Sequence, residues 1–181
     1  MDGRHSLLID PGAWPNLVGE KWAVEMDLKA SKAGHLSTEE KLTRPFKAKG
    51  IGLGTNTAEW EVTIPIAVEE GDRNTLLQSY TALIVGESGS DLPALLGLKS
   101  MSSHRAILEM TPGEEYLTGP GGYTMNWPPG TRRYKLEKSS SGHLVLPCDR
   151  YAEVKKNVSG MEPLLQDFQA VSTASGTEPL L

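Results

Sequence analysis

Frequent glycine and proline residues restrict this chain to short secondary-structure elements. The sequence has 19 glycines and 12 prolines among 181 residues, more than the ~12% that these two residue types make up together in an average protein. Proline interrupts both helices and sheet ladders, and glycine weakens the interior of either. We therefore expect one mainly β domain of ordinary size, with many turns and few long helices.

The charge and the apolar pattern exclude several classes of partner. The 18 basic and 23 acidic residues give a net charge of −5, so no basic field is available to bind a phosphate backbone, and we expect no nucleic acid. Every apolar run is far shorter than the ~20 residues that cross a bilayer, so we expect no membrane association. The N-terminus is polar and Cys148 is the single cysteine, which favours a cytoplasmic location.

Apolar patterns predict several short strands. Residues 60–66 alternate between apolar and polar side chains, which is typical of a half-buried strand, and we extend this strand over 58–68. Pro65 cannot donate to a ladder, so it indicates an edge or a bulge. Further strands are expected at 6–9, 80–85 and 106–108, and as a hairpin of 134–137 with 143–146.

Two helices are predicted from apolar residues at helical spacing. Apolar side chains recur at every fourth position from Val18 to Met26, within a helix expected over 17–33 and capped by Gly34. The apolar patch at 92–101 predicts a second, shorter helix with Pro93 in its first turn. Residues 35–49 are polar and basic, and we expect them to form a surface connection.

Changes in composition divide the chain into three parts. Residues 6–110 contain most of the apolar segments and are expected to form the main domain. Residues 111–156 are expected to form a C-terminal extension that contains the hairpin. Residues 157–181 are rich in Ser, Thr, Gly and Glu, with too few apolar side chains to offset the entropy of ordering, so we expect a disordered tail.

No metal or nucleotide motif is present in the sequence. The histidines are far apart, and neither they nor Cys148 show metal-ligand spacing. The glycines at positions 50, 52 and 54 are followed by a predicted strand, whereas a phosphate-binding loop is followed by a helix whose N-terminus faces the phosphate. We therefore expect neither a metal nor an organic cofactor.

An acidic side chain at the end of a predicted buried strand is the strongest chemical signal. Asp10 follows the apolar residues 7–9 and precedes the tight turn Pro11-Gly12-Ala13. A carboxylate in that position is costly to ionise unless a partner compensates it. Taken alone, Asp-Pro-Gly is also a common β-turn, so both a structural and a chemical interpretation remain open.

The order of three segments resembles a retropepsin-like (acid protease) domain, and more narrowly the proteases of copia-like retrotransposon polyproteins. These segments are 9–13, 50–54 and 95–98, and the resemblance covers residues 6 to 110. It implies a mainly β half-barrel with one inserted amphipathic helix and a short C-terminal helix. The implied site residues are the catalytic Asp10, its loop Pro11, Gly12 and Ala13, the flap Gly50, Ile51, Gly52, Leu53 and Gly54, and the loop support Leu95, Leu96 and Gly97.

The resemblance implies an aspartic endopeptidase of retroelement origin. In such enzymes two adjacent carboxylates share one proton; one activates a water for attack and the other protonates the developing oxyanion. This chain has one Asp-x-Gly-Ala loop, so the resemblance implies a homodimer in which Asp10 meets its symmetry mate. The substrate would be an extended peptide, such as a segment of a polyprotein, and no cofactor is implied.

Two features depart from the family pattern and leave alternatives open. Pro11 stands where the family has threonine or serine, so a bracing hydroxyl is missing, and only nine residues precede Asp10 where the family usually has a further strand. The alternative function is a catalytically inactive retropepsin-like remnant that acts as a dimerising or peptide-binding module. A further alternative is an unrelated β-rich domain in which the Asp-Pro-Gly turn occurs by chance.

Overall fold

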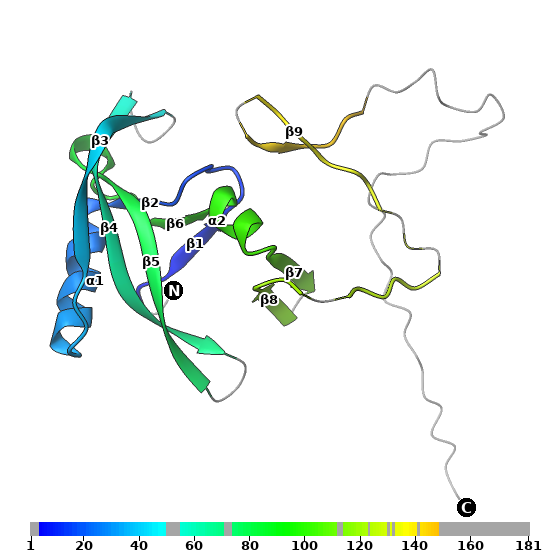
Figure 1. The fold of residues 1–181 in the computed structure, drawn as a ribbon, viewed down its shortest axis with the longest axis horizontal. Coiled ribbons are helices and arrows are strands. Elements are labelled where there is room, and N and C mark those ends of the chain that lie inside the picture. Colours follow the sequence, from blue (N-terminus) through cyan, green and yellow to red (C-terminus); the bar gives the residue numbers. More distant parts are fainter. Residues whose placement is uncertain are drawn as a thin grey trace, which may run out of the picture. The chain divides into compact units, whose positions relative to one another are not determined.

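The computed structural model is mainly β (Figure 1) and describes residues 4–49, 55–70, 74–111, 114–122, 124–129, 131, 133–140 and 142–148. Its elements in chain order are β1 Leu7–Asp10, β2 Leu17–Gly19, α1 Glu20–Lys32, β3 Thr38–Lys49, β4 Thr55–Glu70, β5 Asn74–Val85, the 3-10 turn η1 Glu87–Gly89, β6 Ala94–Gly97, α2 Leu98–Ser103, β7 Ile107–Thr111, β8 Glu114–Thr118, β9 Glu137–Lys138 and β10 Leu144–Val145.

In the six-stranded sheet the short strand β6 lies between the short strands β1 and β2. Its strand order is β1-β6-β2-β5-β4-β3, so β1 and β2, which follow each other in the chain, do not pair with one another. Strand β6 pairs in parallel with β1 and antiparallel with β2. The connection between β1 and β2 therefore crosses one end of β6, and this connection is the Asp10 loop, defined as residues 10–16.

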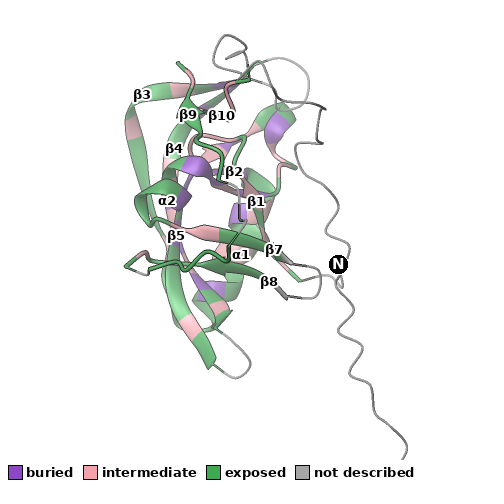
Figure 2. Cartoon of the chain, turned by 90° about the vertical axis from the view of Figure 1, so that its right-hand side faces the viewer, coloured by how far each residue is buried: buried purple, intermediate pink, exposed green. Residues whose placement is uncertain are grey.

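Two hydrophobic clusters hold α1 and the loop to the sheet. The first joins Trp22, Ala23 and Met26 of α1 to inward-facing residues of β4 and β5, such as Ile64 and Ala82. Figure 2 shows buried residues on the sheet and α1, whereas β7, β8 and β9 are mostly exposed. Burial of apolar surface stabilises by ~25 cal/mol per Å², so this packing holds α1 on the sheet.

The second hydrophobic cluster lies beneath the Asp10 loop. It contains Leu17, Ala48, Val85 and Leu95, and Ala13 of the loop packs against it. Ala48 lies near the end of β3, which pairs antiparallel with β4 as far as Lys49 opposite Thr55. The end of β3 therefore contacts the same cluster as the Asp10 loop.

Helix α1 begins three residues later than the sequence predicts. The helix expected over 17–33 spans Glu20–Lys32, and its first three predicted residues form β2 instead, because Leu17–Gly19 pair with Leu83–Val85 of β5. The expected C-terminal cap is confirmed: Gly34 has a φ of +85°, and the N–H of His35 donates to the Ala30 carbonyl at 2.9 Å. This is the left-handed helix ending that glycine favours.

Two further sequence predictions are wrong and several are confirmed. Residues 38–49 of the expected surface connection form β3, an edge strand that pairs with β4. The helix predicted at 92–101 is instead β6 followed by α2, which begins only at Leu98. The strands expected near 6–9, 58–68, 80–85 and 106–108 are present. The hairpin is present too, but its first arm is paired only over Glu137–Lys138 and its second over Leu144–Val145, where 134–137 and 143–146 were expected. Strand β8 was not predicted.

Pro65 lies where one neighbour of β4 ends. Its partner in β5 is Ser79, and on the other side the pairing with β3 stops at Thr63 opposite Thr38. Strand β4 is therefore an edge strand at Pro65, as the missing N–H predicts.

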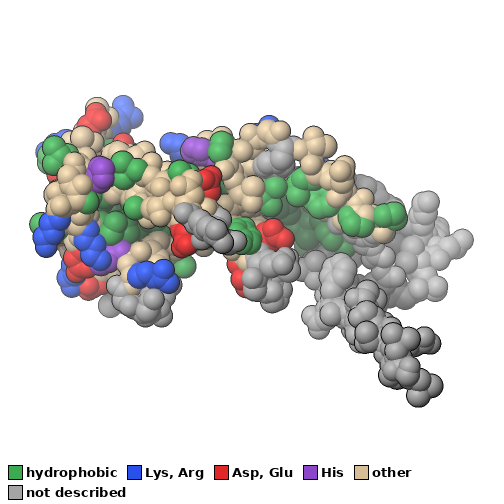
Figure 3. All heavy atoms as spheres, turned by 90° about the horizontal axis from the view of Figure 1, so that it is seen from below, with side chains coloured by type: hydrophobic (Ala, Val, Ile, Leu, Met, Phe, Trp, Pro, Cys, Tyr) green, Lys and Arg blue, Asp and Glu red, His purple; other side chains and the backbone are tan. Residues whose placement is uncertain are grey.

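No helix among the described residues is long and apolar enough to span a bilayer. On the face shown in Figure 3, basic and acidic side chains are interspersed rather than separated by sign.

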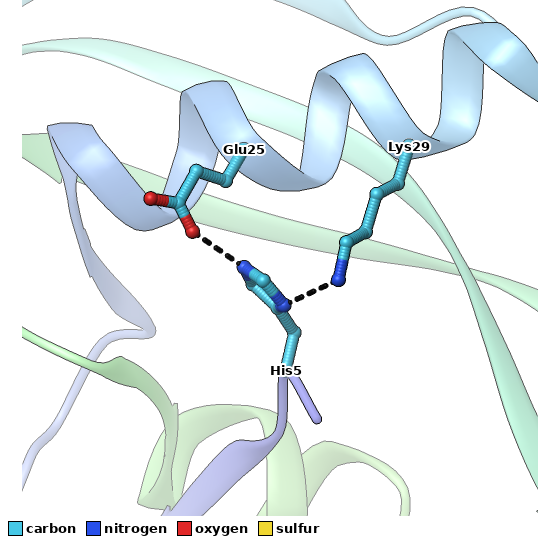
Figure 4. A network of polar contacts seen from close by, with 3 residues as sticks. All are labelled: His5, Glu25 and Lys29. Carbon is cyan, nitrogen blue, oxygen red and sulfur yellow. Dashed lines mark hydrogen bonds and ion pairs between the residues drawn. The ribbon is translucent and has the colours of Figure 1, made fainter. Parts of the chain in front are cut away.

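The residues that precede β1 are fixed to α1 by a polar cluster (Figure 4). The Nζ of Lys29 donates to Nδ1 of His5 at 2.7 Å, and Nε2 of His5 lies 2.7 Å from a Glu25 carboxylate oxygen. Because Nδ1 accepts, Nε2 carries the proton and donates to Glu25. The His5 ring also contacts Trp22, with centroids 6.0 Å apart. The cluster therefore sets the start of the strand that ends at Asp10.

The contacts divide the chain into two units, residues 1–146 and 147–181. All the elements listed above belong to the first unit. Of the second unit the structure describes Pro147 and Cys148, and the Cys148 thiol is exposed and unpaired. The tail predicted to be disordered, 157–181, lies outside the described residues.

Candidate functional site

Asp10 is the last residue of β1, and its own loop holds one of its carboxylate oxygens. Oδ1 accepts hydrogen bonds from the backbone N–H of Gly12 at 2.9 Å and of Ala13 at 3.3 Å. The Ala13 N–H also lies 3.2 Å from the Asp10 carbonyl oxygen. Aspartate commonly closes a turn in this way. Hydrogen bonds to a charged acceptor are stronger than neutral ones, so the turn orients the carboxylate as well as closing the loop.

The second carboxylate oxygen of Asp10 is available. Oδ2 has no hydrogen bond to any residue that the structure describes, and the Asp10 side chain is half-buried. Pro11 and Gly12 are exposed beside it. Oδ2 can therefore accept a proton from, or donate one to, a water, a peptide or a second carboxyl group that approaches the loop.

A side chain at position 12 would crowd the Asp10 carboxylate. A Cβ atom built on Gly12 would lie 3.0 Å from Oδ1 of Asp10, which is tighter than ordinary van der Waals contact. A side chain here would push the carboxylate away from the two N–H groups that hold it. Pro11 has no N–H to add to them.

Strand β6 supports the loop from below through Gly97. Gly97 is the register partner of Asp10, and a Cβ on it would lie 2.3 Å from the carbonyl oxygen of Pro15. The loop backbone therefore crosses β6 at a distance that only glycine permits. The Asn16 side chain completes this junction: its oxygen accepts from the Gly97 N–H and its amide donates to the Thr81 carbonyl, both at 2.8 Å.

The start of α2 is hydrogen-bonded to the same loop. The N–H of Leu98 donates to the Ala13 carbonyl at 2.8 Å, and the N–H of Lys99 donates to the Trp14 carbonyl at 2.9 Å. The first N–H groups of a helix have no partner within the helix. Here the loop carbonyls satisfy two of them, so the position of α2 and the shape of the loop depend on each other.

Tyr80, in β5, links β6 to β2 beneath the loop. Its hydroxyl donates toward the carbonyl oxygens of Leu95 in β6, at 2.8 Å, and Leu17 in β2, at 3.0 Å. The side chain is 3% exposed, and this burial raises the pKa of the Tyr80 hydroxyl well above its usual range. The hydroxyl therefore stays protonated and structural near neutral pH.

A C-terminal hairpin contacts the outer side of the Asp10 loop. Nε2 of His143 lies 2.6 Å from the Gly12 carbonyl oxygen, and the Lys138 ammonium lies 5.2 Å from the centre of the Trp14 ring. The sequence predicts this hairpin but carries no signal for its contact with the loop, because the contacting residues are separated by more than a hundred positions. His143 is therefore a site residue that sequence reasoning missed.

The predicted site residues fall into three groups. Asp10, Pro11, Gly12 and Ala13 form the loop, and Leu95, Leu96 and Gly97 lie in β6, which is hydrogen-bonded to β1. Leu95 is buried in the cluster beneath the loop. The predicted flap residues Gly50, Ile51, Gly52, Leu53 and Gly54 lie outside the described residues, between the paired ends of β3 and β4.

One hollow in the described part of the chain lies away from Asp10. A cavity of about 460 Å³ lies between α1 and the sheet and is lined by Val24, Asp27, Leu28, Trp60 and neighbouring side chains. None of the residues that line it belongs to the Asp10 loop. Within the described part of the chain, no group of three or more His, Cys, Asp and Glu side chains could hold a metal ion.

Comparisons with known proteins assign no family to this arrangement. No protein-family model matches the chain, and no curated protein matches it.

Proposed function

We propose that this chain is a retropepsin-like aspartic endopeptidase that acts as a homodimer on extended peptide segments. The observation that carries the proposal is the Asp10 carboxylate: one oxygen is held by two backbone N–H groups and the other is available for proton transfer. In the proposed dimer, Asp10 and its symmetry mate share one proton, because two adjacent carboxylates cannot both ionise. The ionised group activates the attacking water and the protonated group stabilises the oxyanion.

The strand arrangement supports a retropepsin-like fold. Strand β6 lies between the two strands that flank the Asp10 loop and leads directly into α2, which is the place the resemblance assigns to its loop-supporting segment. Strands β3 and β4 flank residues 50–54, and Ala48 shares a hydrophobic cluster with Ala13. We assign residues 50–54 as the flap that closes over the substrate, and the substrate as a strand held between flap and loop.

The first experiment compares wild type with Asp10→Asn. Cleavage of an internally quenched peptide library is followed from about pH 4 to 7, where shared-proton carboxylate pairs titrate. We expect Asp10→Asn to lose at least ~100-fold in rate, the usual contribution of acid–base catalysis. Asp91→Asn is the matched control, because Asp91 is exposed and pairs only with the exposed Lys21 among the described residues. Equal cleavage by wild type and Asp10→Asn would refute the proposal.

A mixing experiment tests the need for two copies of the loop. An excess of Asp10→Asn protein is added to a fixed amount of wild type, so that most wild-type subunits enter mixed dimers with one carboxylate. We expect cleavage to fall as the variant is added, because a single Asp10 lacks its partner for proton sharing. Unchanged cleavage would show that one chain suffices, and would contradict the homodimer.

Pro11 separates the enzyme from the alternative of an inactive remnant that binds peptides or dimerises. Threonine at this position supplies the hydroxyl and N–H that proline lacks. We expect Pro11→Thr to raise the cleavage rate of an active protein. A wild-type protein without activity, whose dimer or peptide complex survives Asp10→Asn, would instead support the remnant.

A further inference from the structure

We infer that His143 is a positioning residue of the Asp10 site, acting through the peptide group that joins Gly12 to Ala13. His143 lies just before β10, and its Nε2 is 2.6 Å from the Gly12 carbonyl oxygen, across 131 positions of sequence. The inference deepens the proposed function, since it rests on Asp10 being the catalytic carboxylate.

The hydrogen-bond direction follows from chemistry alone. A carbonyl oxygen can only accept, so Nε2 of His143 carries a proton and donates it to Gly12. The Gly12 carbonyl and the Ala13 N–H belong to one planar peptide group and point in opposite directions. That N–H donates to Oδ1 of Asp10 at 3.3 Å. His143 and the Asp10 carboxylate therefore hold the same peptide group from its two ends.

This chain of hydrogen bonds has two effects on the loop. The bond from His143 adds a further support to the Gly12–Ala13 peptide, whose N–H already donates to the carbonyl oxygen and to Oδ1 of Asp10. It also polarises the peptide, which strengthens the N–H as a donor, because hydrogen bonds in a chain reinforce one another. The Ala13 bond is the longer of the two that Oδ1 accepts, so it is the one that depends most on this support.

Two further contacts hold the hairpin against the loop. The Lys138 ammonium lies over the ring of Trp14, 5.2 Å from its centroid. Gly142 has a φ of +89°, and a Cβ built on it would lie 3.1 Å from a Trp14 ring atom, so the ring packs directly on the hairpin turn. The Ser139 N–H donates to the His143 carbonyl at 2.9 Å, which closes the hairpin. In Figure 1 the hairpin with β9 lies beside the loop that joins β1 to β2.

The test compares His143→Ala with His143→Gln. Glutamine keeps a side-chain N–H donor, whereas alanine removes it. Misplacement of a catalytic group by ~1 Å can cost ~100-fold in rate, so we expect His143→Ala to lose at least ~10-fold in kcat. KM should stay within about twofold, since the lost interaction acts in the transition state, and His143→Gln should recover most of the rate. His35→Ala is the control, because His35 is exposed and its side chain makes no hydrogen bond or ion pair with a described residue.

A second readout does not require catalysis. In NMR spectra of the full chain, we expect the Ala13 amide proton of His143→Ala to move upfield and to exchange faster with solvent, while His143→Gln stays close to wild type. If His143→Ala does not fold, Gly142→Val provides the same test, because its side chain displaces the hairpin from Trp14 while His143 is retained.

The outcomes separate the two proposals. An Ala13 amide and a kcat that are both unchanged in His143→Ala would overturn the positioning role. A rise in KM with kcat unchanged would overturn it as well, since it would mean that the hairpin contacts substrate rather than the loop. If wild type and Asp10→Asn cleave equally, the endopeptidase proposal fails, and the Ala13 amide still decides whether His143 orders the loop.

Discussion

Replacing Gly97 by alanine is the sharpest test of how the loop is supported. A Cβ at this position would lie 2.3 Å from the Pro15 carbonyl oxygen, 2.7 Å from the Pro15 carbonyl carbon and 2.9 Å from the Trp14 carbonyl oxygen. All three atoms are backbone, so no side-chain rotation relieves the overlap. The loop and β6 have to separate by on the order of 1 Å before these contacts reach van der Waals range.

The expected loss of stability follows from that overlap. Overpacking a well-packed site costs ~1–3 kcal/mol, and a clash with backbone on two residues belongs at the upper end, about 3 kcal/mol. For a chain of this length each kcal/mol changes the unfolding midpoint by ~2–4 °C, so we expect Gly97→Ala to unfold about 6–12 °C below wild type. The separation would also weaken the hydrogen bonds of α2 to Ala13 and Trp14.

Gly86→Ala is the matched control for Gly97→Ala. Its Cβ would meet only a Glu20 carboxylate oxygen at 3.7 Å, and its φ of −95° is open to any residue. We expect its free energy of unfolding to stay within about 0.5 kcal/mol of wild type. Both variants are measured by thermal and denaturant unfolding. A Gly97→Ala protein as stable as Gly86→Ala would refute the close crossing of loop and strand.

Two other predictions concern the junctions around the loop. Asn16→Ala removes the acceptor of the Gly97 N–H and the donor to the Thr81 carbonyl, and we expect the free energy of unfolding measured with denaturant to fall by ~2–3 kcal/mol. Replacing the exposed Asn126 by alanine is the control and should have little effect. Equal losses in the two variants would contradict the role of Asn16. The pKa of the Tyr80 hydroxyl is raised in the folded protein, so as the pH rises the unfolded chain loses the hydroxyl proton before the folded protein does. The stability that the buried hydroxyl contributes is therefore complete below about pH 10. Above that pH it declines by up to ~1.4 kcal/mol per pH unit. Tyr80→Phe should remove this contribution to the fall of unfolding free energy with pH between about pH 10 and 12. Identical pH dependence in wild type and Tyr80→Phe would show that Tyr80 is not buried.

The sequence identifies the residues of the loop but not all of the strands around them. Asp10 follows a continuous apolar run and precedes proline and glycine, so the end of β1 and the turn are visible locally. The helical spacing from Trp22 to Met26 is also local, and α1 is confirmed. Strand β2 was merged into that helix because its three residues are too few to show a period of their own.

Edge position and apolar ambiguity explain the other errors. Strand β3 is an edge strand that carries many charged side chains and buries Ala48, and charge on edge strands is a common protection against aggregation. Such a strand is hard to distinguish from a loop by hydrophobicity. Residues 94–97 are continuously apolar up to Gly97, a pattern that suits a buried strand as well as a helix. Only their pairing with β1 decides between the two.

The contact of His143 with Gly12 could not have been predicted from sequence. It joins an imidazole to a backbone carbonyl, and a backbone carbonyl exists at every residue, so no residue type marks the acceptor. The hairpin itself is predicted from its turn residues. Its place beside Trp14 depends on how the intervening segments pack.

The sheet order has a consequence for a nascent chain on the ribosome. In the six-stranded sheet, β1 is terminal, and among the described strands it pairs with β6 alone. Translation delivers residue 10 long before residue 97, and closing so wide a span carries an entropic penalty that slows non-local pairing. An emerging polypeptide thus contains the acidic residue and its turn early and pairs them with the sheet late, once the codons for Ala94–Gly97 have been translated.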